Sequence, residues 1–177
     1  MQEAIQETRP RWKDESELKG IVVEMVTCLE DVPLINGNES ELDEALINLV
    51  FNAVDAMPEG GTISIRTEVV EGNVVLTFSD TGKGMDAEIK ERIFEPFFTT
   101  KADVGTGLGL STVYNAVTRW GGSLEVESEP GVGTTFMLRF ITWIEPETQE
   151  NEEADILGTR SGQKHLIEEQ RCNDLDS

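Results

Sequence analysis

The chain has 177 residues, 38% of them hydrophobic, and a formal net charge of −21. This length suffices for one domain with a buried core. The strong acidity argues against nucleic acid or an anionic membrane surface as a partner, because both are bound through clustered basic residues.

Localisation and redox state follow from two further features of the sequence. No apolar run reaches the roughly 18 residues that would span a membrane, so we expect no membrane segment. Cys28 and Cys172 lie far apart along the chain. They predict free thiols in a reduced, cytoplasmic protein.

Composition divides the chain into three zones. Residues 1–19 are polar and predict a linker with a first helix that begins at Pro10. Residues 20–144 hold nearly all the apolar periodicity and predict the folded domain. Residues 145–177 are acidic, lack an apolar stripe, and predict a largely disordered tail.

Within the central zone, strands and helices alternate in a simple order. β-branched or alternating apolar residues predict strands at residues 20–29, 62–70, 73–80, 123–129 and 133–143. Helical spacing predicts helices over 39–57, with Asn38 as the N-cap, and over 108–120. This order predicts an α/β (α+β) two-layer sandwich, with a mixed, mostly antiparallel sheet and helices on one face.

The first of these helices carries an unusual polar stripe. Asn48, Asn52 and Asp55 fall within about 60° of one another at 100° per residue. A solvated helix face is one interpretation of this stripe. Asn, however, is a poor helix former, and its amide oxygen is a hard ligand that suits Mg²⁺ bound together with phosphates. The stripe therefore also predicts a ligand or metal site.

Two glycine-containing motifs follow. "DTGKGM" places Asp80 at a strand end, where it could accept a hydrogen bond from an exocyclic amine, and Gly82 and Gly84 let a flat ring approach the backbone. Alone, a motif of this kind is usually just a turn. "GTGLGLS" (105–111) opens the second helix, and its free amides can cradle phosphates. It matches neither the Walker nor the dinucleotide pattern, and a flexible loop is its alternative.

Together the motifs resemble the ATP-binding catalytic domain of sensor histidine kinases, in the superfamily shared with DNA gyrase, mismatch-repair ATPases and heat-shock chaperones. "ELDEALINLVFNAVDAMPEGG" resembles the N box, "DTGKGM" the G1 box, "IFEPFFTTK" the F box and "GTGLGLS" the G2 box. "GVGTTFMLRF" resembles the closing strand pair, and the resemblance covers about residues 10–142. It implies a Bergerat-type ATP-binding fold that uses ATP and Mg²⁺.

The resemblance also implies residue roles. Asn52 would be the magnesium ligand, and Asp80 would bind the adenine amino group, with support from Thr134. Asn48 replaces the glutamate base of the ATPase relatives, and its amide cannot take a proton, which fits transfer to a protein. Asn48 and Lys101 would be the catalytic residues. The implied ATP-binding residues are Asn48, Asn52, Asp55, Asp80, Gly82, Gly84, Met85, Thr100, Lys101, Gly105, Thr106, Gly107, Leu108, Gly109, Leu110 and Thr134.

Residues 94–106 would form a mobile lid over the nucleotide. Lys101 would meet the γ-phosphate there, although a solvated lysine is the alternative. The bunched Phe94, Phe97 and Phe98 predict either a hinge or docking patch, or plain hydrophobic packing.

By the same resemblance, the activity would be transfer of the γ-phosphate to a histidine of a separate helical phosphoacceptor domain, with a response regulator downstream. The single histidine, His165, does not match the acceptor context, so we expect the acceptor outside this chain and an isolated domain that is monomeric. A protein-serine kinase of the anti-sigma-factor type and a non-catalytic ATP-sensing module are the alternatives. Gyrase-like hydrolysis is least favoured, because the catalytic glutamate is missing.

Overall fold

The computed structural model describes residues 2–18, 20–101 and 105–143. The described residues belong to one compact unit, Met1–Trp143. The predicted acidic tail, together with His165 and Cys172, lies outside the described residues. None of the helices within the described ranges is both long and apolar enough to cross a membrane.

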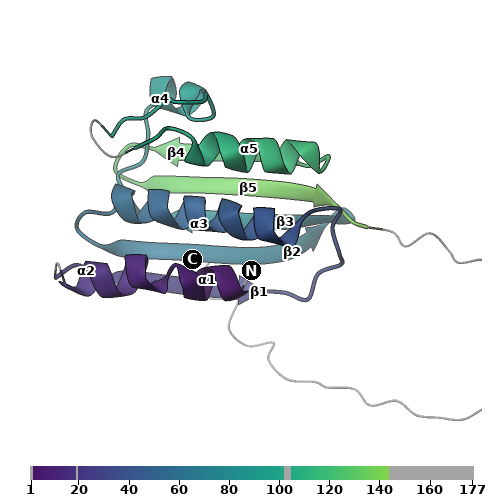
Figure 1. The fold of residues 1–177 in the computed structure, drawn as a ribbon, viewed down its shortest axis with the longest axis horizontal. Helices are drawn as coiled ribbons and strands as arrows, with labels where there is room; N and C mark the ends of the chain where they lie inside the picture. Colours follow the sequence, from purple (N-terminus) through teal and green to yellow (C-terminus); the bar gives the residue numbers. More distant parts are fainter. Residues whose placement is uncertain (1, 19, 102–104, 144–177) are drawn as a thin grey trace, which may run out of the picture. The chain divides into compact units, whose positions relative to one another are not determined.

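One five-stranded sheet forms the first layer (Figure 1). Its order is β1-β2-β3-β5-β4. Strand β1 pairs with β2 in parallel, and the other three pairings are antiparallel. The mixed, mostly antiparallel sheet is therefore confirmed. The strands span Val23–Leu29 (β1), Gly61–Val70 (β2), Asn73–Asp80 (β3), Ser123–Glu129 (β4) and Gly133–Ile141 (β5).

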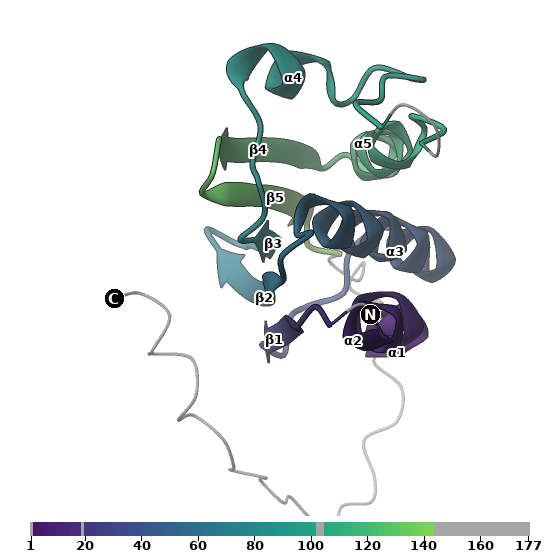
Figure 2. The ribbon, with the colours of Figure 1, turned by 90° about the vertical axis from the view of Figure 1, so that its left-hand side faces the viewer.

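Helices form the second layer and cover one face of the sheet (Figure 2). Helix α3 (Glu39–Ala56) lies over the middle, α5 (Gly109–Arg119) lies toward β4, and the N-terminal helices lie toward β1. The predicted two-layer sandwich is thus confirmed. The N-terminal helices are α1 (Gln2–Glu7), the π-helical η1 (Pro10–Asp14) and α2 (Glu15–Leu18).

The core lies between these layers and fixes the register. Alternate residues of β2 and β3 point toward the helices, because side chains alternate along a strand. Among them, Ile63 and Phe78 are completely buried, as is Leu49 of α3. Burying such a side chain stabilises the fold by roughly 1.5–3 kcal/mol. This packing brings Asp80, at the end of β3, to the edge where α3 ends.

Three expectations about local structure need correction. The N-terminal helical segment begins at Gln2 rather than at Pro10, because Ala4 and Thr8 are buried beside α3. Helix α4 (Ala87–Arg92) was not predicted, although Asp86 caps it by accepting a hydrogen bond from the Ile89 amide at 2.8 Å. Cys28 is disulfide-bonded, so the expectation of a free thiol at this position is wrong.

Candidate nucleotide-binding site

Asp80 is a buried carboxylate at the end of β3. Only 8% of its surface is exposed, and its Oδ1 accepts a hydrogen bond from the Gly82 amide at 2.9 Å. Burial raises the pKa of the Asp80 carboxyl, while hydrogen bonds from the backbone amides of Gly82 and Thr134 oppose the rise. The backbone therefore holds this carboxylate in a fixed place, where it can accept from a ligand amine.

The loop after β3 is fixed between α3 and the β4–β5 turn. The Lys83 amide donates to the Ala56 carbonyl at 2.9 Å, and the Lys83 carbonyl accepts from the Gly131 amide at 2.8 Å. At Gly82, a Cβ would lie 2.8 Å from atoms of Ala56. Gly84 has a φ of +62°, and a Cβ there would collide with the backbone of Glu129. Both glycines are thus required by close backbone approach.

Ser128 links two of the predicted nucleotide-binding residues, and no sequence motif pointed to it. Its Oγ accepts from the Met85 amide at 2.9 Å and lies 3.0 Å from Oγ1 of Thr134, which is 6% exposed. It also donates to the Gly133 carbonyl at 2.9 Å. Nothing in the local sequence around Ser128 indicates these contacts, because they depend on the β4–β5 pairing.

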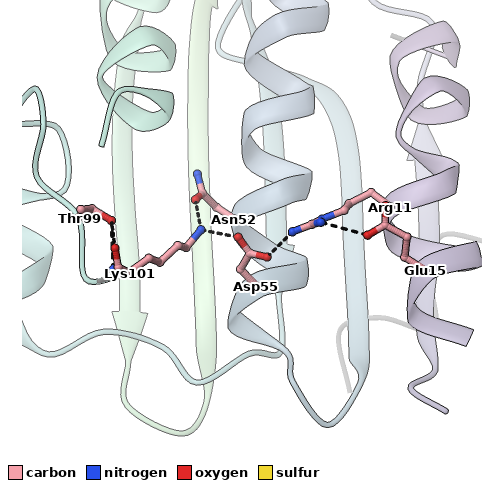
Figure 3. A network of polar contacts seen from close by, with 6 residues as sticks. All are labelled: Arg11, Glu15, Asn52, Asp55, Thr99 and Lys101. Atoms are coloured by element: carbon pink, nitrogen blue, oxygen red, sulfur yellow. Dashed lines mark hydrogen bonds and ion pairs between the residues drawn. The ribbon is translucent and has the colours of Figure 1, made fainter. Parts of the chain in front are cut away.

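A second polar cluster lies on the outer face of α3 (Figure 3). The Lys101 Nζ donates to Asn52 Oδ1 at 3.1 Å and to Asp55 Oδ2 at 2.6 Å. The other Asp55 oxygen, Oδ1, accepts from Arg11 Nη2 at 2.9 Å. Arg11 in turn pairs through Nη1 with Glu15 at 3.0 Å. Two cations from distant parts of the chain therefore meet on the Asp55 carboxylate.

The Asp55 carboxylate and the Arg11 guanidinium of this cluster shift each other's pKa values. Burial would raise the pKa of Asp55, but the hydrogen bonds and charges of Lys101 and Arg11 outweigh it and lower that pKa. Burial would likewise lower the pKa of Arg11, but Asp55 and Glu15 outweigh it and raise that pKa. Asp55 is accordingly ionised near neutral pH, and the Arg11 guanidinium stays charged beside it.

The glycines of residues 105–109 allow close contacts beside this cluster. A Cβ at Gly109, the first residue of α5, would lie 3.1 Å from Asn48 Oδ1. Gly107 has a φ of +67°, its carbonyl accepts from the Phe97 amide at 2.9 Å, and a Cβ there would collide with the Phe97 backbone. The start of α5, with its free amides, is thus adjacent to the polar stripe of α3.

The structure groups most of the predicted ATP-binding residues at these two places. One group surrounds the end of β3, and the other joins the stripe of α3 to Lys101 and the start of α5. Leu110 instead packs against the hydrophobic core, and Leu108 is 40% exposed. Thr100 and Thr106 are exposed.

The three phenylalanines of the F box have different surroundings. Phe94 stacks on Tyr114 with ring centroids 5.1 Å apart, and Arg92 lies 4.3 Å from the ring centroid of Phe98. Phe97 is 75% exposed and has a φ of +69°. Phe94 and Phe98 therefore make packing contacts, whereas Phe97 is available to a partner.

The residues present fit a magnesium ion that is bound together with a phosphate ligand. Asn52 Oδ1 already faces a cation, the Lys101 ammonium group, so it is oriented as an oxygen ligand. Across the described part of the chain, no group of three or more His, Cys, Asp or Glu residues could hold a metal. The remaining ligands would therefore be phosphate oxygens and waters, as Mg²⁺ commonly requires.

Comparisons with known proteins identify the family to which the chain is similar. The family model described as histidine kinase-, DNA gyrase B-, and HSP90-like ATPase matches residues 37–142. Sporulation kinase A of Bacillus subtilis (strain 168) is 39% identical over 126 residues, covering 71% of this chain and 20% of that protein. Sensor histidine kinase ZraS of Escherichia coli (strain K12) is 40% identical over 112 residues, covering 63% of this chain and 24% of that protein.

Among solved structures, the nucleotide-free catalytic domain of the histidine kinase ThkA is 30% identical, with a TM-score of 0.65. The match covers 80% of this chain and 92% of that domain. The chain thus spans about a quarter or less of the length of the two curated relatives, but it corresponds to nearly all of the ThkA domain.

Proposed function

Since the chain belongs to the histidine kinase-, DNA gyrase B-, and HSP90-like ATPase family, we propose that it binds MgATP and transfers the γ-phosphoryl group to a histidine. The acceptor histidine lies on a separate helical phosphoacceptor domain, and a response regulator receives the phosphoryl group in turn. Because the reaction consumes ATP, we assign the domain to the cytoplasm.

The observation that carries this proposal is the position of α3 relative to both polar groups. Its last residue, Ala56, accepts a hydrogen bond from the Lys83 amide in the loop after Asp80, and Asn52 lies four residues earlier, about 6 Å along the axis. A ligand with an amine-bearing ring at Asp80 and a cation-bound anion at Asn52 therefore fits the two ends. MgATP has both features.

The residues of the chain then have distinct roles in transfer. Asp80 accepts a hydrogen bond from the adenine amine, and the backbone amides at the start of α5 donate to phosphate oxygens. Asn52 would provide an amide oxygen to magnesium, and the bound ion would supply neutralisation of negative charge on the phosphates. Lys101 moves from Asn52 to the γ-phosphate. Asn48 cannot accept a proton, so it does not activate water for hydrolysis.

The acceptor histidine supplies the nucleophile. Its neutral imidazole nitrogen forms a bond to the γ-phosphorus while the bond to the bridging oxygen breaks, and ADP leaves. Positioning and charge neutralisation therefore account for the contribution of this domain. The names of the matched relatives, a sporulation kinase and a sensor histidine kinase, favour this reaction over serine phosphorylation.

Transfer of label from ATP tests the proposal. The protein is incubated with γ-labelled ATP and Mg²⁺, alone and with a separately expressed hairpin domain that bears a histidine. We expect label on the hairpin that is acid-labile and alkali-stable. Acid-stable label would indicate a serine kinase, and MgATP binding without transfer to any offered hairpin would indicate an ATP-sensing module. Absence of MgATP binding would overturn the proposal.

A further inference from the structure

Arg11 contacts the candidate nucleotide-binding site from outside the matched family region. It lies in η1, whereas the family match begins at residue 37. Its guanidinium lies 2.9 Å from Asp55 Oδ1, across 44 residues of sequence. None of the sequence motifs includes Arg11.

Arg11 and Lys101 compete for one carboxylate. Each binds a different oxygen of Asp55, at 2.9 and 2.6 Å, so each cation weakens the attraction that the carboxylate exerts on the other (Figure 3). The side chains are 29–37% exposed, so the interactions are partly screened but remain short. The strength with which Asp55 holds Lys101 therefore depends on Arg11.

Lys101 also occupies the atom that the proposed function assigns to magnesium. Its ammonium donates to Asn52 Oδ1 at 3.1 Å. An ammonium and a divalent cation repel each other and cannot both bind this oxygen. Magnesium can therefore bind with ATP only after Lys101 has left Asn52.

Arg11 is held at Asp55 by contacts that do not involve the nucleotide. Its Nη1 pairs with Glu15 at 3.0 Å, and its guanidinium lies 5.7 Å from the ring centroid of Phe51. Because Glu15 and Phe51 orient the guanidinium, Arg11 partly neutralises Asp55 before any ligand arrives.

We propose that Arg11 is a positioning residue for the nucleotide site: by sharing Asp55 with Lys101, it sets how readily Lys101 leaves Asn52 when MgATP binds. The inference rests on the proposed function. It makes the N-terminal helical segment part of the site, and it makes Asp55 a partner of Lys101 rather than of ATP.

Calorimetric affinity for MgATP is the first test. Arg11→Gln should weaken MgATP binding by about three- to tenfold, because Lys101 is then held more strongly, and about 1.4 kcal/mol corresponds to tenfold. Arg11→Lys keeps the charge and should restore most of the affinity. Arg119→Gln is the matched control, because it removes the same charge from an ion pair with Glu41, about 21 Å along α3 from Asp55. Wild-type affinity in Arg11→Gln would overturn the inference.

A double-mutant cycle distinguishes competition for Asp55 from a general loss of folding. Asp55→Asn releases Lys101 and should bind MgATP more tightly than the wild type. Adding Arg11→Gln to Asp55→Asn should then change the MgATP affinity no more than Arg119→Gln does, because the shared carboxylate is gone. If Arg11→Gln causes the same loss in both backgrounds, Arg11 acts through the fold and the inference is wrong.

Hydrogen exchange of the nucleotide-free protein gives a readout that does not depend on ATP. The Lys101 amide donates to Thr99 Oγ1 at 3.1 Å, and the Phe97 amide donates to Gly107. Exchange at these amides should slow about threefold in Arg11→Gln and accelerate in Asp55→Asn. Unchanged exchange would overturn the competition for Asp55. If the two variants change exchange as expected but the wild type binds no MgATP, the proposed function alone would be overturned.

Discussion

The two ends of the candidate site are built in different ways. At the end of β3, Asp80 is buried and is held by backbone amides and by glycines that admit no side chain. On α3, Asp55 is held by the ends of two long, partly exposed side chains, Lys101 and Arg11. The first end can receive a ligand without rearrangement. The second must exchange ion-pair partners before a ligand can bind.

The two carboxylates also differ in the direction of their pKa shifts. Burial raises the pKa of Asp80. The cations around Asp55 outweigh its burial and lower the pKa of Asp55. Ionisation of Asp80 therefore destabilises the ligand-free protein, and a hydrogen bond from a ligand amine can offset this effect. Ionised Asp55, in contrast, already has two cationic partners.

The largest expected effect on nucleotide binding comes from replacing the Asp80 carboxylate at the buried end of the site. Asp80→Asn should weaken nucleotide binding by at least about 100-fold, because the new amide nitrogen would face the ligand amine as a second donor. The amide oxygen can still accept from the Gly82 amide, so the fold should persist. Calorimetry measures the loss, and circular dichroism checks the fold. Normal MgATP binding by a folded variant would show that the adenine assignment is wrong.

Gly84→Ala tests how far the buried end depends on a fixed backbone. The variant should lose about 2 kcal/mol or more of unfolding free energy, because the new Cβ collides with the Glu129 backbone at a positive φ. Gly131→Ala is the matched control, since its φ is +80° but the space around it is open. It should lose only about 1 kcal/mol. Equal losses in urea unfolding would contradict the role of close approach.

Asn52→Ala tests the exchangeable end. The variant should bind MgATP about tenfold more weakly, because one oxygen ligand of the metal is lost. Its affinity for ATP in the presence of a chelator should not fall, because no metal is then bound and Lys101 has lost one of its acceptors. Asn73→Ala, at the first residue of β3 and thus at the opposite end of that strand from Asp80, serves as the control for removing an asparagine side chain. A loss of equal size with and without Mg²⁺ would assign Asn52 to phosphate rather than metal.

The smallest expected effect concerns stability and pH. The folded-state pKa of Asp55 is lowered, so the ionised side chain contributes to the free energy of unfolding at pH values above its ordinary pKa of 3.8. This contribution is lost as the pH falls through the lowered pKa. Asp55→Asn should therefore be less stable near neutral pH, by less than about 1 kcal/mol for such exposed pairs.

Asp80 should show the opposite sign. The folded-state pKa of Asp80 is raised, so its contribution to the free energy of unfolding is fully present below pH 3.8, its ordinary pKa. This contribution is lost as the pH rises through the raised pKa. Asp80→Asn should thus be more stable than the wild type near neutral pH. Urea unfolding at several pH values measures both variants. Shifts of the same sign would remove the contrast between the two ends.

The buried end was largely predictable from local sequence. The helical spacing and the Asn38 cap predicted α3 to within one residue at its C-terminus, and alternation predicted the hairpin that ends at Asp80. These signals are local because periodicity and capping act within a few residues. The same reasoning would have found α4 if Asp86 had been considered as its N-cap.

The contacts that tune the site were not predictable in this way. Arg11 reaches Asp55 across 44 residues, and Ser128 reaches Met85 across 43. Such pairs depend on the packing of η1 beside α3 and on the register of β4 with β5. A single sequence contains no periodic signal for either.

The strand order has a consequence for the synthesis of the chain. Strand β4 is joined to the rest of the sheet only through β5, which follows it in sequence and lies between it and β3. During translation, β1 must also wait for β2, which follows the 18 residues of α3. The sheet therefore cannot be completed until Gly133–Ile141 have emerged from the ribosome, and nascent chains that end earlier should remain sensitive to protease.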